Sequence, residues 1–141
     1  MIRKTLHSLV AGAALMALMA TSAHALEVAG VKLEDTAKVG GKELVLSGAG
    51  LRTKVVKLYA LGVYLPKKES TAAGVLAATG PRRFELVMLR EISSEDFGNA
   101  FLMGINKNLD KDEKAKLFTP LANLGEMFER IGGLKKGDVM L

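Results

Sequence analysis

Arg52 and Tyr59 are the two side chains of this sequence whose types and surroundings point to chemistry. The Arg52 guanidinium is a permanently charged planar fork that suits a carboxylate or another oxyanion, and the small residues 48–51 leave room beside it. Tyr59 lies within the apolar run 58–65, and a buried tyrosine needs a partner for its hydroxyl. Simpler roles stay open: Arg52 at a strand end or paired with Glu43, and Tyr59 bonded to a backbone carbonyl.

The spacing of the two residues sets a condition on any shared site. Residues 52 and 59 are seven apart, so in one continuous strand their side chains point to opposite faces. Arg52 and Tyr59 share a face only if a turn or bulge interrupts the strand at Thr53-Lys54.

The positions of histidine and cysteine exclude several kinds of catalytic site. Both histidines, His7 and His24, lie near the N-terminus, and the chain has no cysteine. If residues 1–25 are removed, no imidazole or thiol is left for a nucleophilic triad, a usual zinc site or a disulfide. The acids gather at predicted helix starts, such as Glu95 and Asp96, where they favour the helix dipole. We therefore predict no catalytic residue, no metal and no cofactor.

Residues 1–25 have the three parts of a secretory signal peptide. Arg3 and Lys4 precede the apolar stretch 9–20, and Ala23-His24-Ala25 offers a cleavage site of small residues. The stretch is shorter than the ~20 residues that a membrane span needs. We predict a periplasmic or secreted protein without a transmembrane anchor after cleavage.

Residues 26–141 then form one predicted domain. The net charge of the whole chain is only +5, and no run of lysine or arginine suggests a nucleic-acid partner. No linker or internal repeat divides this part of the chain.

The hydrophobic pattern predicts strands first and helices after them. Alternating or continuous apolar segments predict strands at 26–33, 43–51, 55–65, 83–92 and from 139 onward. Caps and helical periodicity predict helices at 70–78, 93–109 and 111–117, and one that begins at Thr119-Pro120 and ends at Gly132. This order predicts an α+β fold in which an antiparallel sheet carries a helical layer on one face. Because the chain stops soon after a strand begins, we expect it to be shortened at the C-terminus.

Two segments carry a family resemblance: GAGLR followed by VVKLYALGVYL, and FELVMLREISSEDFGNAF. The first is similar to the GAG-x-R … K-F-T-x-I-G-V-Y-L region of chalcone isomerases and their relatives, and the second resembles the next strand and helix of that family. The resemblance covers most of residues 28–138 and is strongest to exported bacterial chalcone-isomerase-like proteins. It implies an open-faced β-sandwich with helices on one side of a large antiparallel sheet and a cleft between them. The family continues beyond the point that corresponds to Leu141.

The resemblance also bears on function. Arg52 matches the family arginine that polarises or anchors the ligand, and Tyr59 stands where the plant enzymes have a threonine. The enzymes carry a tyrosine and an asparagine on the later helices, but no tyrosine follows Tyr64 here. Another catalytic threonine would lie past Leu141. Arg52 with Tyr59 instead resembles the pair that holds a carboxylate in the fatty-acid-binding branch.

We therefore predict non-catalytic binding of a small apolar carboxylate, such as a fatty acid, by Arg52 and Tyr59. The alternative is an isomerase, an intramolecular lyase of the chalcone isomerase type acting on a phenolic enone. A third possibility is an interaction module with a collapsed cleft, in which Arg52 pairs with an acid.

Overall fold

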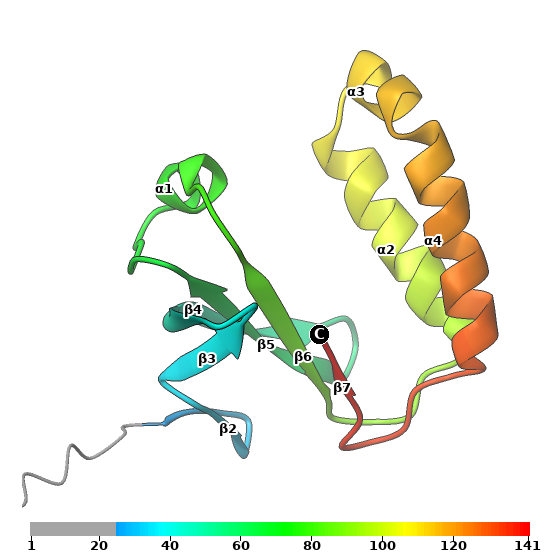
Figure 1. The fold of residues 1–141 in the computed structure, drawn as a ribbon. Helices are drawn as coiled ribbons and strands as arrows, with labels where there is room; N and C mark the ends of the chain where they lie inside the picture. The colour runs from blue at the N-terminus through cyan, green and yellow to red at the C-terminus, as the bar shows by residue number, and fades with distance from the viewer. Residues whose placement is uncertain (1–24) are drawn as a thin grey trace, which may run out of the picture.

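A five-stranded antiparallel sheet forms the centre of the molecule, with the strand order β3-β4-β5-β6-β7 (Figure 1). The computed structural model describes residues 25–141, so the predicted signal peptide lies outside the described part except for its last residue. The sheet contains β3 (Thr36–Val39), β4 (Lys42–Thr53), β5 (Lys57–Leu65), β6 (Arg83–Met88) and β7 (Val139–Met140). A separate hairpin contains β1 (Leu26–Val28) and β2 (Val31–Leu33). The helices are α1 (Ala72–Ala77), α2 (Ser94–Asn108), α3 (Lys111–Lys116) and α4 (Phe118–Ile131). The predicted α+β class is confirmed.

The register of the strands divides their side chains between two faces. Opposite residues of an antiparallel pair share a face, and Tyr59 pairs with Met88 while Leu61 pairs with Leu86. These residues lie on the face toward α2 and α4, where Tyr59 and Leu86 pack against Met88 and Phe97. We call this the helix face of the sheet.

The other face of the sheet is closed by the β1–β2 hairpin. Leu33 of β2 packs there with Leu44 and Leu46 of β4 and Tyr64 of β5, and none of the four is more than 9% exposed. We call this cluster the closed core. As the sequence predicted, β5 is an inner strand, paired with β4 on one side and β6 on the other.

Several predicted strand boundaries were wrong. Residues 26–33 form two strands, because Ala29 and Gly30 take positive φ angles of 52° and 83° and reverse the chain. Strand β4 continues through Gly48 and Gly50, and its irregularity is a register shift between Leu46 and Gly48. Strand β3 was not predicted, and β5 and β6 are shorter than the predicted 55–65 and 83–92.

The caps explain where most helices begin and end. Ser93 Oγ accepts a hydrogen bond of 3.0 Å from the Asp96 amide at the start of α2, and Asp110 forms a capping box with Glu113 at α3. Gly132 ends α4 with a φ of 72°, as predicted.

Two helix starts differ from the prediction. Helix α1 begins after Thr71, whose side chain accepts from the Gly74 amide. Helix α4 begins at Phe118 without a side-chain cap, since Leu117 ends α3 and starts α4.

The helical pair α2 and α4 is attached to the sheet at one end. Phe97 of α2 and Phe128 of α4 meet edge to face at 5.2 Å between ring centroids, and both pack with Met88 and Leu134. Farther from this attachment the two helices stand away from the sheet (Figure 1). Among residues 25–141, no helix is long and apolar enough to cross a membrane.

Candidate binding cleft

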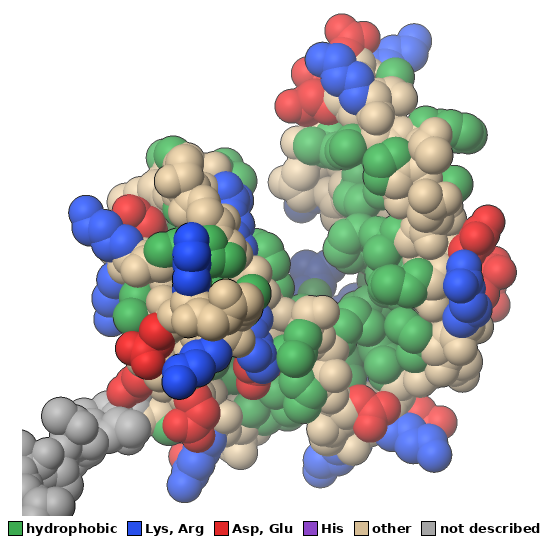
Figure 2. Space-filling model, in the orientation of Figure 1, with side chains coloured by type: hydrophobic (Ala, Val, Ile, Leu, Met, Phe, Trp, Pro, Cys, Tyr) green, Lys and Arg blue, Asp and Glu red, His purple; other side chains and the backbone are tan. Residues whose placement is uncertain are grey.

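A cleft of about 780 Å³ lies between the helix face of the sheet and the pair α2 and α4. Hydrophobic side chains cover both of its walls (Figure 2). Among residues 25–141, Arg52 supplies the only charged side chain of its lining, and Tyr59 and Asn108 supply the other polar side chains. The apolar walls are made by Leu58, Leu61, Phe84, Leu86, Ile92, Phe97, Ala100, Phe101, Ile105, Leu109, Leu124, Met127, Phe128, Met140 and Leu141.

The cleft is open to solvent on part of its surface. Phe84 from the sheet is 46% exposed, and Phe101 and Met127 from the helices are 42% and 43% exposed. Away from their attachment, α2 and α4 stand away from the sheet (Figure 1). The apolar side chains on the two walls therefore do not pack against each other. The possibility of a collapsed cleft does not describe this structure.

Arg52 and Tyr59 are direct cross-strand partners at one end of this cleft. Strand β4 ends at Thr53, β5 begins at Lys57, and the Lys54 amide donates to the Val56 carbonyl at 3.1 Å across the turn. Because the chain reverses between them, the two side chains share a face despite their odd separation. The required interruption is present, as a turn after Thr53 together with a register shift between Arg52 and Thr53. Their role in binding a ligand stays a prediction.

Arg52 is exposed and has no charged partner in the described chain. The two ion pairs found in residues 25–141 are Arg83–Glu85 and Arg130–Glu126. Glu43 lies opposite Lys38, nine residues from Arg52 along β4, which is about 30 Å in an extended strand. The suggested pairing of Arg52 with Glu43 is therefore wrong.

Tyr59 forms part of the floor of the cleft. Its ring lies 6.3 Å from the Phe97 ring, at 56° to it, and packs against the cluster around Met88. Within residues 25–141 no hydrogen bond of the Tyr59 hydroxyl is found, so the suggested carbonyl partner is not seen. The packing fixes the ring, and its hydroxyl is available to a ligand.

Tyr64 is on the opposite face and has no place in the cleft. Its side chain is 1% exposed, within the closed core. Burial, and next the negative charge of Glu85, raise the pKa of Tyr64 above its ordinary value of 10.0. The phenol is therefore neutral at physiological pH.

Sequence reasoning missed the helical wall of the cleft. Ala100, Gly104 and Asn108 are four residues apart on α2, and all three line the cleft. A Cβ added at Gly104 meets no atom within 4 Å, so this position leaves space open. The small residues Ala100 and Gly104, spaced by one helical turn, were the feature of the sequence that could have indicated this wall of the cleft. Among residues 25–141, no group of acids or other usual ligands is arranged to hold a metal ion.

A smaller hollow of about 430 Å³ lies against α2 and α4. Gly125 lines it, together with the acids Glu95 and Glu129. The acids make this hollow a poor site for an anion.

These features define an open-faced α+β sandwich with a single-cation apolar cleft between its sheet and its helices. Residues 25–141 match the family described as chalcone isomerase-like, and the chain belongs to that family. The predicted resemblance is confirmed at the level of the family. A search of curated proteins gave no significant match.

Proposed function

We propose that this domain binds a small apolar carboxylate, such as a fatty acid, and does not act on it chemically. The observation that carries the proposal is the lining of the cleft, which is apolar apart from one cation, the Tyr59 hydroxyl and one amide. A volume of about 780 Å³ falls within the range of roughly 300–1,000 Å³ typical of small-molecule sites.

The proposed contacts follow from the positions of the lining residues. The Arg52 guanidinium donates to the carboxylate at the rim, and the Tyr59 hydroxyl donates a second hydrogen bond from the floor. The apolar chain of the ligand then lies between Leu61 and Leu86 of the sheet and Ile105 of α2. Each buried methylene adds about 0.8 kcal/mol, and a hydrogen bond to a charged group adds about 1.5–3 kcal/mol. Because Arg52 is exposed, the carboxylate stays partly hydrated.

The absence of a general base from the lining supports binding over catalysis. No carboxylate or imidazole side chain is among the residues that line the cleft in the described chain, so among side chains proton transfer has only the phenol of Tyr59 to use. The alternative is the isomerase, in which Arg52 polarises the carbonyl of a phenolic enone. Loss of chalcone absorbance that vanishes in Arg52→Ala supports that alternative and contradicts the proposal.

The test is calorimetric titration of delipidated protein with fatty acids of increasing chain length. Affinity should rise with chain length until the cleft is filled. Arg52→Met should weaken binding of the acids by about 10- to 100-fold, since a charge-assisted hydrogen bond contributes about 1.5–3 kcal/mol. The matching fatty alcohols should bind both proteins equally.

Arg90→Met is the matched control, because Arg90 is also exposed but does not line the cleft. Neither substitution should change the melting temperature by much, as Arg52 has no partner in the described chain. Binding of no acid at all contradicts the proposal. So does an Arg52→Met variant that melts much earlier but binds every acid as before.

We also propose that residues 1–25 direct export to the periplasm or the medium. The support is the charged start, the short apolar stretch and the Ala23-His24-Ala25 site. N-terminal sequencing of protein from the periplasmic fraction should begin at Leu26. Full-length protein found only in the cytoplasm contradicts this.

A further inference from the structure

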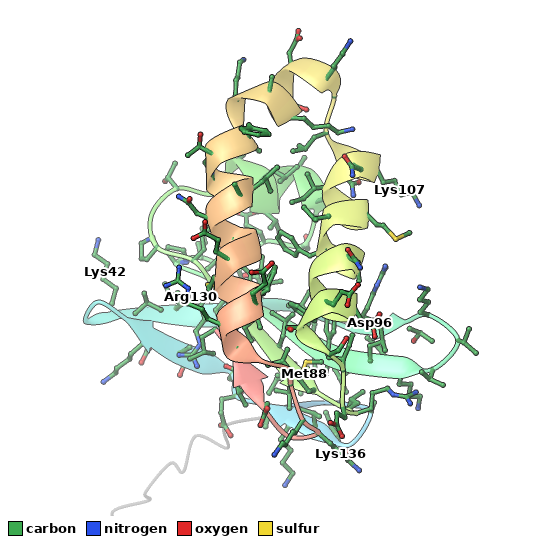
Figure 3. All side chains as sticks on the ribbon, turned by 90° about the vertical axis from the view of Figure 1, so that its right-hand side faces the viewer. Lys42, Met88, Asp96, Lys107, Arg130 and Lys136 are labelled. Carbon is green, nitrogen blue, oxygen red and sulfur yellow. The ribbon has the colours of Figure 1, made fainter. Side chains whose placement is uncertain are left out.

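The turn between β4 and β5 is the most exposed apolar point of the described chain. Val55 is 97% exposed, compared with 77% for Leu76 and 76% for Phe118, and Val56 beside it is 41% exposed. Figure 3 shows the sheet edge-on, with Lys42 at the far end of the β3–β4 hairpin; the β4–β5 turn is at the opposite end of β4. Residues 25–141 leave Val55 almost fully uncovered and Val56 partly uncovered, and this exposure of apolar side chains to water is unfavourable.

Along the β4–β5 hairpin itself, every charged residue near the turn is positive. Arg52, Lys54 and Lys57 are exposed, and no acidic residue occurs in the sequence between Glu43 and Glu69. None of the three cations takes part in an ion pair within residues 25–141. Two apolar side chains flanked only by cations are the arrangement that an anionic lipid surface attracts and accepts.

The turn also adjoins the mouth of the cleft. Arg52 and Tyr59, which line the cleft, are each within four residues of Val55 along the hairpin. We propose that the β4–β5 turn docks on an anionic lipid surface, with Val55 and Val56 entering the headgroup region and the three cations facing the lipid charges. This holds whether or not the cleft takes a fatty acid.

A protein partner fits the turn less well. A stable protein interface buries about 800 Å² on each side, which a three-residue turn cannot supply by itself. A lipid surface needs no complementary shape, and a few cations with one shallow apolar insertion are enough for weak, reversible binding.

The test is binding of purified protein to vesicles of phosphatidylcholine alone and of phosphatidylcholine mixed with an equal amount of phosphatidylglycerol. Binding should favour the anionic vesicles by on the order of 100-fold, since each cation near the surface contributes about five-fold. It should fall as salt is added, because exposed charges are screened.

Paired variants separate the turn from the general charge of the protein. Lys54→Gln with Lys57→Gln should weaken binding by roughly 25-fold. Lys67→Gln with Lys68→Gln makes the same charge change at the other end of β5 and should have little effect. Val55→Asp should abolish binding, whereas Leu76→Asp on α1 should not.

Val55→Trp gives a direct reading of insertion. The chain has no tryptophan, so the fluorescence of this variant reports on the turn alone. A blue shift is expected with anionic vesicles and not with neutral ones. The proposal is overturned if binding is absent at low salt, if both lysine pairs weaken it equally, or if the tryptophan spectrum does not move.

Discussion

The two faces of the sheet are built from the same strands, but one face is packed against a hairpin and the other is partly open to solvent. On one face, the β1–β2 hairpin brings Leu33 onto Leu44 and Tyr64, and all three are at most 1% exposed. On the other face, α2 and α4 touch the sheet around Phe97 and Phe128 and then stand away from it. The result is a closed core behind the sheet and an open cleft in front of it.

The comparison shows how one sheet can combine stability with space for a ligand. A small domain buries enough apolar surface to fold only if most of its core is packed, and the closed core together with the Phe97–Phe128 cluster provides this. The rest of the helix face therefore does not need to be packed for the domain to fold.

Leu44→Ala should have the largest effect on stability. Leu44 is fully buried, and removing a buried leucine side chain costs about 2–5 kcal/mol in the free energy of unfolding. Leu61→Ala is the same change on the wall of the cleft, and should cost under about 2 kcal/mol because Leu61 is only partly buried. Urea denaturation of both variants measures the difference. Equal losses would mean that the two faces do not differ in this way.

Gly104→Leu should fill part of the cleft while making α2 more stable. A glycine inside a helix costs about 1 kcal/mol relative to better helix formers, so the melting temperature should rise. Taking the room of two or three ligand methylenes should cost roughly 2 kcal/mol of binding, or about 30-fold in Kd for long acids.

Gly125→Leu is the matched control for Gly104→Leu, since an added Cβ there also meets nothing within 4 Å and Gly125 lines only the smaller hollow. It should stabilise α4 and leave calorimetric affinities unchanged. If both glycine variants bind long acids as the parent does, the ligand does not lie along α2.

Tyr59→Phe should weaken binding of a carboxylate by about 1.5 kcal/mol, the low end for a hydrogen bond to a charged group, because the carboxylate stays partly hydrated and the ring is kept. Titration of the same acids measures this loss, and the fatty alcohols provide a comparison in which the charge is absent. Tyr64→Phe, on the opposite face, should leave affinity unchanged. An equal effect of the two substitutions would point to a change in the fold instead of a lost contact.

Alkaline pH should produce the smallest effect that can be assigned to the closed core. The pKa of Tyr64 is raised by burial in the folded protein, so the folded state holds its proton more tightly than the unfolded state does. The stabilisation from the neutral phenol is complete below about pH 10 and is lost as the pH rises through the folded-state pKa. Melting temperatures between pH 9 and 11 should fall less steeply in Tyr64→Phe. An unchanged slope would contradict this assignment.

Local sequence signals were enough to predict the class of the fold and most of the helices. Apolar alternation, caps at Ser93 and Asp110, and Gly132 are local signals, and local signals set the type of an element and often its ends. Local signals do not predict the end of a strand when that end depends on hydrogen bonds to a neighbouring strand. Strand β6 stops at Met88 because the chain then leaves β5, and β3 exists because β4 offers it hydrogen bonds.

The same distinction holds for the site. The sequence picked out Arg52 and Tyr59 by their chemistry, and stated the turn that they need in order to share a face. The three-dimensional structure was needed to show that this turn exists and that Tyr59 packs on Phe97. It also shows that Arg52 and Glu43 lie about 30 Å apart along β4. The small residues of α2 and the family resemblance point to a cleft, but not to its size or its lining. The volume of the cleft is set by the orientation of α2 and α4 relative to the sheet. That orientation depends on contacts between residues far apart in the chain, such as Met88, Phe128 and Leu134.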